Sequence, residues 1–587
     1  MKNAQNVFFL ILCRLRIENS NFLYLENKMG KIKMTETSKL TIPALFNESV
    51  KNYSAKKSLV FVGEENYTYQ QLGSDAKLVA TLLSNFGISK GDKVAILSTN
   101  MPNWGVAFFA VSLIGAVAVP ILPDFHDNEI KTIIEHSEAK IMFVSTGLFG
   151  SLTNESKQLL DQIILIENFA VVPKNISAQK LTELKPSLPT TIKESIFAEV
   201  EEEDLASIIY TSGTTGNSKG VMLTHKNLAW TTQQCYTLQE IKSSDRFISL
   251  LPLSHTLENT VGFLLPVKYG ASVHYLRKPP VPSVLLPALE VVKPTIMLVV
   301  PLIIEKVFRS KIYPAFQKSP LTRFLYSAAP TRKILNKVAA KKLHKTFGGE
   351  LRFFGIGGAK LDPTVERFLF EGGFPYAIGY GLTETSPLLA GAVPGKTKIG
   401  STGIAMEGVK LRIANANPET GEGEIQAKGE NVMRGYYKAP EMTNEVFTED
   451  GWFKTGDRGC FDKQNMLHIK GRIKTMIVGA SGENIYPEEI ESVINRMRFV
   501  LESLVVEKKG KLVAMIHLNM EEIESNFKLM KDEAQHFIHD KSEEILKEIH
   551  KKVNEEVNKF SRIQQVVLQS DPFEKTPTKK IKRFLYA

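Results

Sequence analysis

The sequence has few cysteines for its length, with only Cys13, Cys235 and Cys460 among 587 residues. No Cys-X-X-Cys pair occurs, and the histidines do not cluster at the spacing of metal ligands. A disulfide framework and a zinc site are therefore not expected. This cysteine usage fits a reducing, cytoplasmic compartment.

The sequence also lacks a good secretory or membrane-spanning segment. The apolar run at residues 7–13 is followed by Arg14 and Arg16 instead of the small residues of a cleavage site. Residues 104–123 are uncharged and have about the ~20 residues that a bilayer requires. Because Gly115 divides this stretch, we expect a buried helix before the glycine and a buried strand after it. No spanning segment is predicted.

Low-complexity segments, internal repeats and a recognisable nucleic-acid-binding module are absent as well. With 43% hydrophobic and 23% charged residues, the composition is that of an ordinary globular protein. The formal net charge of +10 suits an acidic carrier protein or an anionic membrane as a partner. No nucleic-acid partner is predicted, and the oligomeric state is left open.

The predicted fold class is α/β, in at least two domains because the chain exceeds what one core usually supports. Residues 1–40 are expected to be an N-terminal extension. Disorder of this extension is one of the interpretations that the sequence allows. Residues 41–470 alternate helix-like segments with short apolar strands, as in βα units around mainly parallel sheets, and end in a β subdomain after residue 400. Residues 471–587 are expected to form a small α+β domain.

The strand candidates of the large domain are short apolar runs, several of which lead directly into glycine-rich turns. They are residues 93–97, 140–144, 206–210, 296–300 and 351–356. Ligands of open α/β sheets bind outside the carboxyl ends of the strands. The turns that follow these strands are therefore where we expect the chemistry.

The turn at residues 211–220 combines several hydroxyl side chains with three glycines and Lys219. Such a turn can bind phosphate, because glycines allow close approach while amides, hydroxyls and lysine supply donors and charge. It is not a Walker A loop, since Ser218 precedes the lysine and Gly220 follows it. A polar turn after an edge strand is the alternative interpretation.

This turn resembles the phosphate-binding signature of the acyl-adenylate-forming superfamily, which includes acyl-CoA synthetases, adenylation domains and luciferases. Further signatures follow in the expected order, so the resemblance extends over residues 40–587. It implies an enzyme that uses ATP and Mg²⁺ to activate a carboxylic acid as an acyl-adenylate. The phosphate contacts that it implies are Thr211, Ser212, Gly213, Thr214, Thr215, Gly216 and Lys219.

Tyr380-Gly-Leu-Thr-Glu resembles the second nucleotide motif of the same superfamily. The resemblance implies that Thr383 contacts the α-phosphate, that Glu384 binds Mg²⁺ and that Tyr380 packs on adenine. A hard cation of this kind prefers carboxylate and phosphate oxygens. Without its flanking motifs, a Thr-Glu pair more often begins a helix.

Two further motifs belong to the implied nucleotide site. Gly358 and Ala359, within Gly-Gly-Ala-Lys at residues 357–360, resemble the turn that contacts adenine, with a plain strand-to-helix turn as the alternative. The Thr-Gly-Asp sequence that ends at Asp457 resembles the element that binds ribose. A carboxylate that accepts from two vicinal hydroxyls is a good physical match. Arg472 is implied to join it.

The C-terminal domain contributes two residues by resemblance. Lys474 occupies the hinge position between the domains, and a lysine there favours relatives that act on fatty acids. Residues 576–583 resemble the terminal motif, which assigns the catalytic lysine to Lys580, with Lys579 as the rival candidate. The small domain is therefore expected to be mobile. A solvated basic tail is the ordinary interpretation of such a run.

His255, in Pro-Leu-Ser-His-Thr-Leu-Glu, resembles the histidine at the mouth of the acyl pocket, although a lone histidine among apolar residues is usually a core residue. The motifs look most like those of long-chain fatty acid-CoA ligases. We therefore predict activation of a long-chain fatty acid and transfer to coenzyme A, with acyl carrier protein as the alternative acceptor. A luciferase-type oxygenase and a silent nucleotide-binding regulator are less favoured interpretations of the same motifs. Peripheral attachment at the inner membrane surface is left open.

Overall fold

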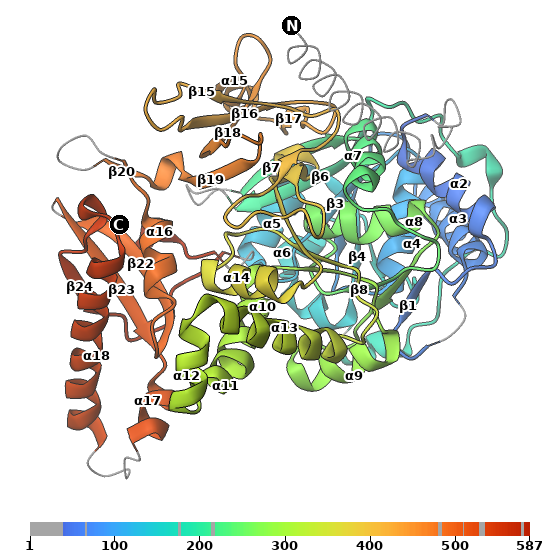
Figure 1. Cartoon of the computed structure of the whole chain (residues 1–587). Helices are drawn as coiled ribbons and strands as arrows, with labels where there is room; N and C mark the ends of the chain where they lie inside the picture. Colours follow the sequence, from blue (N-terminus) through green and yellow to red (C-terminus); the bar gives the residue numbers. More distant parts are fainter. Residues whose placement is uncertain are drawn as a thin grey trace, which may run out of the picture. The chain divides into compact units, whose positions relative to one another are not determined.

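The computed structural model describes residues 39–64, 67–173, 176, 178–212, 218–478, 484–508, 510–527, 534–576 and 580–586. The chain divides into two compact units, Met1–Lys39 and Leu40–Ala587. All elements described below belong to the second unit, and Figure 1 labels most of its helices and many of its strands. Apart from Lys39 and Leu40, the predicted N-terminal extension lies outside the described residues.

One large sheet has seven strands in the order β17-β7-β6-β3-β2-β4-β5. The strands from β6 to β5 pair in parallel, whereas β7 is antiparallel to both β6 and β17. Its central strands are buried on both faces, which explains their continuous apolar runs. The strands are β2 (Lys93–Leu97), β3 (Val117–Ile121), β4 (Ala139–Val144), β5 (Gln162–Leu165), β6 (Leu205–Ser212), β7 (Ser218–Thr224) and β17 (Gly435–Tyr436).

The second large sheet has eight strands in the order β1-β9-β8-β10-β11-β12-β13-β14. Pairing is parallel from β1 to β12 and antiparallel between β12, β13 and β14. All five predicted strands occur in the two large sheets, as β2, β4, β6, β10 and β11. The eight are β1 (Leu59–Phe61), β8 (Arg246–Ser249), β9 (Ser272–Tyr275), β10 (Ile296–Val299), β11 (Phe353–Ile356), β12 (Tyr376–Gly381), β13 (Leu388–Gly391) and β14 (Ile404–Ala405).

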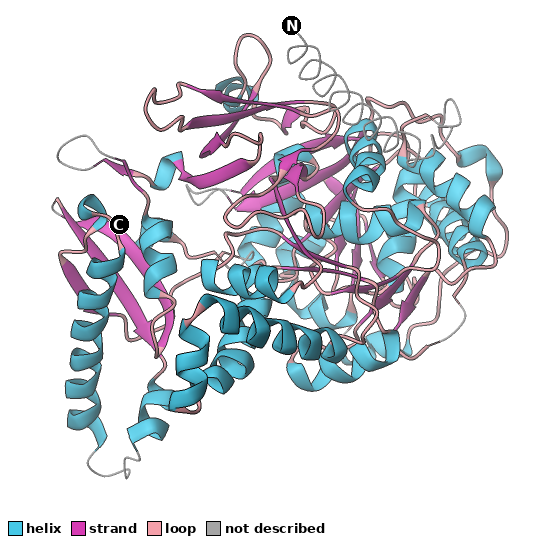
Figure 2. Cartoon of the chain, viewed as in Figure 1, coloured by secondary structure: helices cyan, strands magenta, loops and turns pink. Residues whose placement is uncertain are grey.

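Helices accompany both large sheets, as Figure 2 shows. They are α2 (Ile42–Tyr53), α3 (Tyr69–Asn85), α4 (Pro102–Leu113), α5 (Asp127–Ser137), α6 (Asn154–Gln158), α7 (His225–Leu238), α8 (Leu265–Lys268), α9 (Pro282–Val292), α10 (Pro301–Val307), α11 (Tyr313–Gln317), α12 (Pro320–Ser327), α13 (Ala329–Thr346), α14 (Pro363–Gly372) and α15 (Pro440–Val446). Short 3₁₀ or π segments are η1 (Thr146–Ser151), η2 (Ala178–Glu183), η3 (Glu194–Ile196), η4 (Glu258–Leu264), η5 (Phe308–Ile312) and η6 (Thr383–Thr385).

The uncharged stretch at residues 104–123 forms most of helix α4 and all of strand β3. Eleven of the twelve residues of α4 are buried in the protein. The helix ends at Leu113, and Gly115 turns the chain into β3 with a φ of 68°, which glycine adopts without steric cost. The predicted buried helix and buried strand are confirmed. Among the described residues, no helix is long and apolar enough to cross a bilayer.

The smaller sheets follow in sequence. A four-stranded antiparallel sheet, in the order β15-β16-β18-β19, confirms the predicted β subdomain. The predicted domain boundary after residue 470 falls within β19, and the division into domains stays a prediction. The strands are β15 (Lys410–Ala414), β16 (Gly423–Lys428), β18 (Phe453–Phe461) and β19 (Leu467–Arg472).

The C-terminal residues form a two-stranded and a three-stranded sheet, with a hydrophobic core of their own. Helices accompany these sheets, as expected of an α+β unit, and residues 528–533, between α17 and α18, lie outside the described part. The elements are η7 (Ile473–Thr475), β20 (Ile477–Val478), β21 (Asn484–Ile485), α16 (Pro487–Ile494), β22 (Val500–Lys508), β23 (Lys511–Leu518), α17 (Met520–Phe527), α18 (Ala534–Glu556), η8 (Lys559–Ser561), β24 (Gln565–Leu568) and η9 (Arg583–Leu585).

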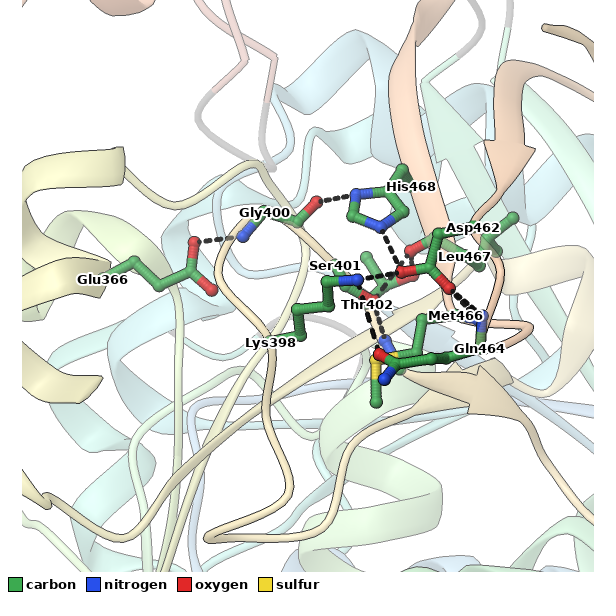
Figure 3. A network of polar contacts seen from close by, with 11 residues as sticks. Glu366, Lys398, Gly400, Ser401, Thr402, Asp462, Gln464, Met466, Leu467 and His468 are labelled. Carbon is green, nitrogen blue, oxygen red and sulfur yellow. Dashed lines mark hydrogen bonds and ion pairs between the residues drawn. The ribbon is translucent and has the colours of Figure 1, made fainter. Parts of the chain in front are cut away.

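A polar network attaches the β18-β19 hairpin to helix α14, as Figure 3 shows. The Glu366 carboxylate accepts a hydrogen bond from the Gly400 amide over 2.9 Å. The ring nitrogens of His468 lie 2.9 Å from the Gly400 carbonyl and 3.1 Å from Asp462 Oδ2. Lys398 forms an ion pair with the same carboxylate oxygen at 2.7 Å. These contacts hold in place the two strands that carry Asp457 and Arg472.

Candidate active site

Asp457 lies at the centre of a polar cluster. It faces Arg472 across the β18-β19 ladder, with Oδ1 2.8 Å from the arginine Nε. Its other oxygen, Oδ2, accepts a hydrogen bond from the Tyr380 hydroxyl over 2.7 Å. An ionised carboxylate has about four acceptor positions, so about two remain for a pair of hydroxyls. The site therefore fits the predicted ribose contact.

Burial affects the electrostatics of this cluster. Desolvation raises the pKa of Asp457, while the positive charge of Arg472 acts in the opposite direction. The pKa of Tyr380 is raised well above its usual value, first by burial and then by the neighbouring aspartate. The Tyr380 hydroxyl is thus a neutral donor to Asp457. The packing of the Tyr380 ring on adenine stays a prediction.

Glu384 lies in η6, where the chain leaves β12. Its Oε1 accepts a hydrogen bond from the Tyr436 hydroxyl over 2.9 Å, and its carbonyl accepts one from the Met433 amide over 2.8 Å. Lys219 Nζ lies 4.9 Å from the centroid of the Tyr436 ring, within the range of a cation-π contact. Tyr436 therefore contacts both predicted nucleotide motifs.

The surroundings of Glu384 fit a magnesium ion that is bound mainly through a nucleotide. Within the described part of the chain, no three His, Cys, Asp or Glu residues gather into a group that could hold a metal. Mg²⁺ commonly takes one or two carboxylates and completes its shell with phosphate oxygens and water. A single carboxylate near a phosphate-binding turn matches that arrangement.

Lys580 reaches this cluster from the end of the chain. Its backbone is held by Thr576, whose amide donates to the Lys580 carbonyl over 2.7 Å. The residue is exposed as a whole, yet protein surrounds its ammonium closely enough that desolvation lowers its pKa. The charge of Arg472 lowers it further, whereas the carboxylates of Asp457 and Glu384 raise it. The lysine is thus within electrostatic reach of both predicted nucleotide carboxylates.

His255 lies near the same ammonium. Its Nδ1 accepts a hydrogen bond from the Leu257 amide over 3.2 Å, which leaves the proton of the neutral ring on Nε2. Burial lowers the pKa of His255 to about 4, and the positive charge of Lys580 acts in the same direction. At neutral pH the ring is therefore uncharged, which suits the border of an apolar pocket.

Comparisons with known proteins identify the family of the chain. Residues 46–437, more than half of the chain, match the family model described as AMP-binding enzyme. The chain belongs to this family. The matched range of this AMP-binding enzyme includes Lys219, His255 and Glu384 and ends before Asp457 and Lys580.

Curated relatives of this AMP-binding enzyme cover most of its length. It is 29% identical to long-chain-fatty-acid-CoA ligase FadD15 of Mycobacterium bovis over 564 residues, which cover 89% of this chain and 90% of that protein. It is 27% identical to long-chain-fatty-acid-[acyl-carrier-protein] ligase AEE15, chloroplastic, of Arabidopsis thaliana. This alignment is 664 residues long, gaps included, and covers 96% of this chain and 88% of that protein.

Solved structures show the same fold. ATP-bound MatB from Rhodopseudomonas palustris has a TM-score of 0.71 at 24% identity, over 93% of this chain and 98% of that chain. O-succinylbenzoate coenzyme A synthetase (MenE) from Bacillus subtilis, in complex with ATP and magnesium ion, has a TM-score of 0.69 at 22% identity, over 92% of this chain and 98% of that chain. The predicted α/β fold class is confirmed.

The remaining predicted residues of the AMP-binding enzyme are only partly described. Thr211 and Lys219 lie opposite each other in the β6-β7 hairpin, and Ser212 lies opposite Ser218. The predicted phosphate contacts Gly213, Thr214, Thr215 and Gly216 lie outside the described residues, as does the rival lysine Lys579.

The predicted residues at the edges of the cluster are accessible. Gly358 and Ala359 form an exposed turn after β11, and Gly358 has a φ of 86°. Thr383 is half-buried beside Glu384, and Lys474 is exposed in η7. Their contacts with a nucleotide, and the hinge role of Lys474, stay predictions.

The sequence analysis missed a buried network behind His255. Asn100 donates to Leu251 O and accepts from the Leu253 amide, over 2.6 and 2.9 Å, and so holds the segment that leads to the histidine. It also donates to Ser249 Oγ over 2.9 Å, which in turn donates to Glu258 Oε1 over 2.5 Å. Glu258 is 2% exposed, and burial raises its pKa to about 8.

Neither Tyr436 nor this network had a signal in the sequence. Tyr436 is one aromatic residue in a two-residue strand, and its partner Glu384 lies in a different sheet region. Glu258 is the last residue of the His255 motif, but its place in the motif gives no indication that the side chain is buried. The π-helical geometry of η4, which often marks functional sites, becomes visible only in the structure.

Proposed function

We propose that this chain activates a fatty acid with ATP and then transfers the acyl group to coenzyme A. In the first step the fatty acid carboxylate attacks the α-phosphate, so that pyrophosphate leaves and an acyl-adenylate forms. In the second step the coenzyme A thiol attacks the acyl carbonyl and AMP leaves. The observation that carries this proposal is the position of Lys580, within electrostatic reach of Glu384, Asp457, Arg472 and His255.

The proposed first step needs positioning and charge stabilisation more than a nucleophilic side chain. Asp457 would hold the ribose hydroxyls, while Lys219 and Lys580 would face the phosphates. Glu384 would hold a Mg²⁺ ion, which offsets negative charge on the phosphates when it is bound. Each cationic contact of this kind contributes a factor of about 10²–10³ in rate.

The proposed second step uses the small domain. We propose that residues 471–587 rotate about Lys474, so that Lys580 leaves the site and a thiol can enter. Two contacts between residues 41–470 and residues 471–587 would have to break in this rotation. Arg309 donates to the Asn495 carbonyl, and Lys360 forms an ion pair with Glu489 at 3.4 Å.

The substrate class and the acceptor are proposed from the named relatives. Several curated relatives carry the name long-chain-fatty-acid-CoA ligase, and one is named for an acyl carrier protein. A long-chain fatty acid with coenzyme A is the preferred pair, and acyl carrier protein is the second candidate acceptor. A cytoplasmic location is proposed from the sparse cysteine usage.

Acid-dependent ATP-pyrophosphate exchange tests the proposal. The purified chain is given a series of fatty acids of increasing length, and the exchange is expected to be strongest with long chains. Mass analysis with coenzyme A or acyl carrier protein then identifies the acceptor. Absence of exchange with every acid would refute adenylate formation, and exchange without any thioester product would refute the second step.

A further inference from the structure

Exposed hydrophobic side chains are concentrated in one segment. Nine of the sixteen large hydrophobic side chains that are exposed in the described part of the chain lie between residues 281 and 338. This segment is about a tenth of the sequence, so a random scatter of single apolar residues does not explain it. Where such residues adjoin on the surface, they usually mark a site that binds a protein or a membrane.

Helix α12 has an apolar flank that faces solvent. Leu321 and Phe324, three residues apart on one side of the helix, are 65% and 72% exposed. Its other side packs on α11, where Tyr326 stacks on Phe316 with ring centroids 4.5 Å apart. No residue of α12 is fully buried. The helix is therefore anchored along one side only.

Helix α13 packs against α12, and the two lie beside each other in Figure 1. Ile334 and Val338, one turn apart, are 64% and 66% exposed. Lys333, Lys337 and Lys341 follow the same four-residue spacing and are also exposed, so a row of lysines runs beside the two apolar residues. We call the set Leu321, Phe324, Ile334, Val338, Lys333, Lys337 and Lys341 the α12-α13 face.

The charge of this region is unusual for the chain. Residues 301–346 contain eleven Lys or Arg and one acidic residue, Glu305, a formal charge of +10. The whole chain also has +10, so the remaining residues, with 62 basic and 62 acidic side chains, are neutral. The net positive charge of the protein therefore resides in this one segment.

Most of these cations form no ion pair within the described part of the chain. Among the described residues, Arg309 pairs with Asp362 and Arg332 pairs with Glu371, whereas the other nine form no ion pair. These nine are all exposed. They are Lys306, Lys311, Lys318, Arg323, Lys333, Lys337, Lys341, Lys342 and Lys345.

We propose that the α12-α13 face docks on an anionic lipid bilayer. Leu321, Phe324, Ile334 and Val338 enter the boundary between headgroups and acyl chains, and the lysines bind lipid phosphates. Large apolar residues beside a row of lysines are the composition of helices that lie in a membrane interface. None of the seven residues belongs to the candidate active site, so this inference goes beyond the proposed function and does not depend on it.

The same features disfavour the other occupants of such a surface. A second copy of the chain would place this positive face against itself, because the two sides of a symmetric contact are identical. Nucleic acid would neutralise the lysines but leave Leu321 and Phe324 without apolar partners. An anionic bilayer offers negative charge and an apolar layer together.

Flotation of the full chain with lipid vesicles tests the proposal. Vesicles of phosphatidylcholine and phosphatidylglycerol are compared with vesicles of phosphatidylcholine alone, at low and high salt. Binding is expected only to the anionic vesicles and is expected to weaken with salt. The triple variant K333Q/K337Q/K341Q should bind them about a hundredfold more weakly, since each lysine near an anionic surface contributes a factor of about five.

Matched controls separate this face from overall charge and from folding. The variant K547Q/K551Q/K552Q changes the net charge equally on α18 and should bind within about twofold of the parent. L321S/F324S should reduce binding at constant charge, whereas I404S, at an exposed site on β14, should not. All variants must unfold at the temperature of the parent.

Three results would overturn the proposal. The first is a parent chain that does not float with anionic vesicles. The second is an equal loss of binding in the α13 and α18 lysine variants, which would show that vesicle binding depends on the net charge and not on the α12-α13 face. The third is a dimer or higher oligomer that dissociates in L321S/F324S, which would assign the face to a second copy.

Discussion

The hydroxyl of Tyr436 on β17 donates a hydrogen bond to Glu384 Oε1 over 2.9 Å. This contact joins an edge strand of the seven-stranded sheet to the turn that follows β12 of the eight-stranded sheet. The same ring lies 4.9 Å from Lys219 Nζ. One tyrosine thus sets the distance between the lysine of the phosphate-binding hairpin and the predicted magnesium ligand.

Replacement of Tyr436 by phenylalanine tests this positioning. Y436F keeps the ring beside Lys219 but removes the donor to Glu384, so the carboxylate is expected to lose its orientation. Since a hydrogen bond to a charged group contributes about 1.5–3 kcal/mol, kcat/KM for MgATP should fall by about tenfold or more. The measurement is exchange at varied Mg²⁺ concentration, where a higher Mg²⁺ requirement is expected.

Tyr437 provides the matched control for that variant. Its hydroxyl donates to the exposed Glu138 over 3.4 Å. Y437F should therefore leave the Mg²⁺ requirement unchanged. Equal requirements in the parent and in Y436F would contradict the positioning role.

Lys580 should matter for one half-reaction only. K580M removes a cation that is within reach of Asp457 and Glu384, so adenylate formation should slow by about 10²–10³-fold. Thioester formation from supplied acyl-adenylate should stay close to the parent rate. K582M, at a lysine 3.8 Å from Glu574, is the control and should affect neither step. Equal losses in both steps would reject the assignment.

The same variant has a readout that does not depend on activity. The positive charge of Lys580 contributes to lowering the pKa of His255 to about 4. Its removal favours the protonated ring, so the pKa of His255 in K580M should lie above that of the parent. NMR titration of the histidine ring measures this value, and an unchanged pKa would show that the two side chains are apart in solution.

Asp457 should act mainly on nucleotide binding. In D457N the amide cannot accept from both Arg472 and Tyr380 as the carboxylate does, and the arginine loses its counterion. KM for ATP should rise by about 10²-fold, with a smaller change in KM for the acid. D450N, at an exposed carboxylate paired with Arg412, is the control and should keep the parent KM. Equal increases in both KM values would argue against the ribose contact.

Glu258 should make stability fall as pH rises. Burial raises its pKa from 4.5 to about 8, so over this range the folded state retains a proton that the unfolded chain has released. The free energy of unfolding therefore decreases with pH, by at most about 1.4 kcal/mol per pH unit from this group. E258Q keeps the neutral shape and should flatten the decrease. Urea unfolding of both proteins from pH 5 to 8 measures it.

The exposed Glu419 supplies the comparison for that experiment. E419Q makes the same Glu→Gln change at an exposed site and should follow the parent curve at every pH. Parallel curves for E258Q and the parent would show that Glu258 is ionised in the folded protein.

Much of the fold followed from local patterns. The apolar runs that became β2, β4 and β6 are nearly continuous because parallel strands are buried on both faces. Gly115 separated α4 from β3 as expected, since its left-handed φ ends the helix. Asp457 and Arg472 were paired by resemblance, and the β18-β19 register places them opposite each other.

The sequence by itself determined which segments are strands and helices, which turns could bind phosphate, and which carboxylates and lysines could serve a nucleotide. Those features depend on periodicity and on neighbouring residue types. The tertiary structure alone decided that Tyr436 contacts Glu384, that Lys580 lies near His255, and that Glu258 is buried. It also decided that the apolar residues of α12 and α13 face solvent. Burial and long-range proximity depend on how distant segments pack, which no local pattern specifies.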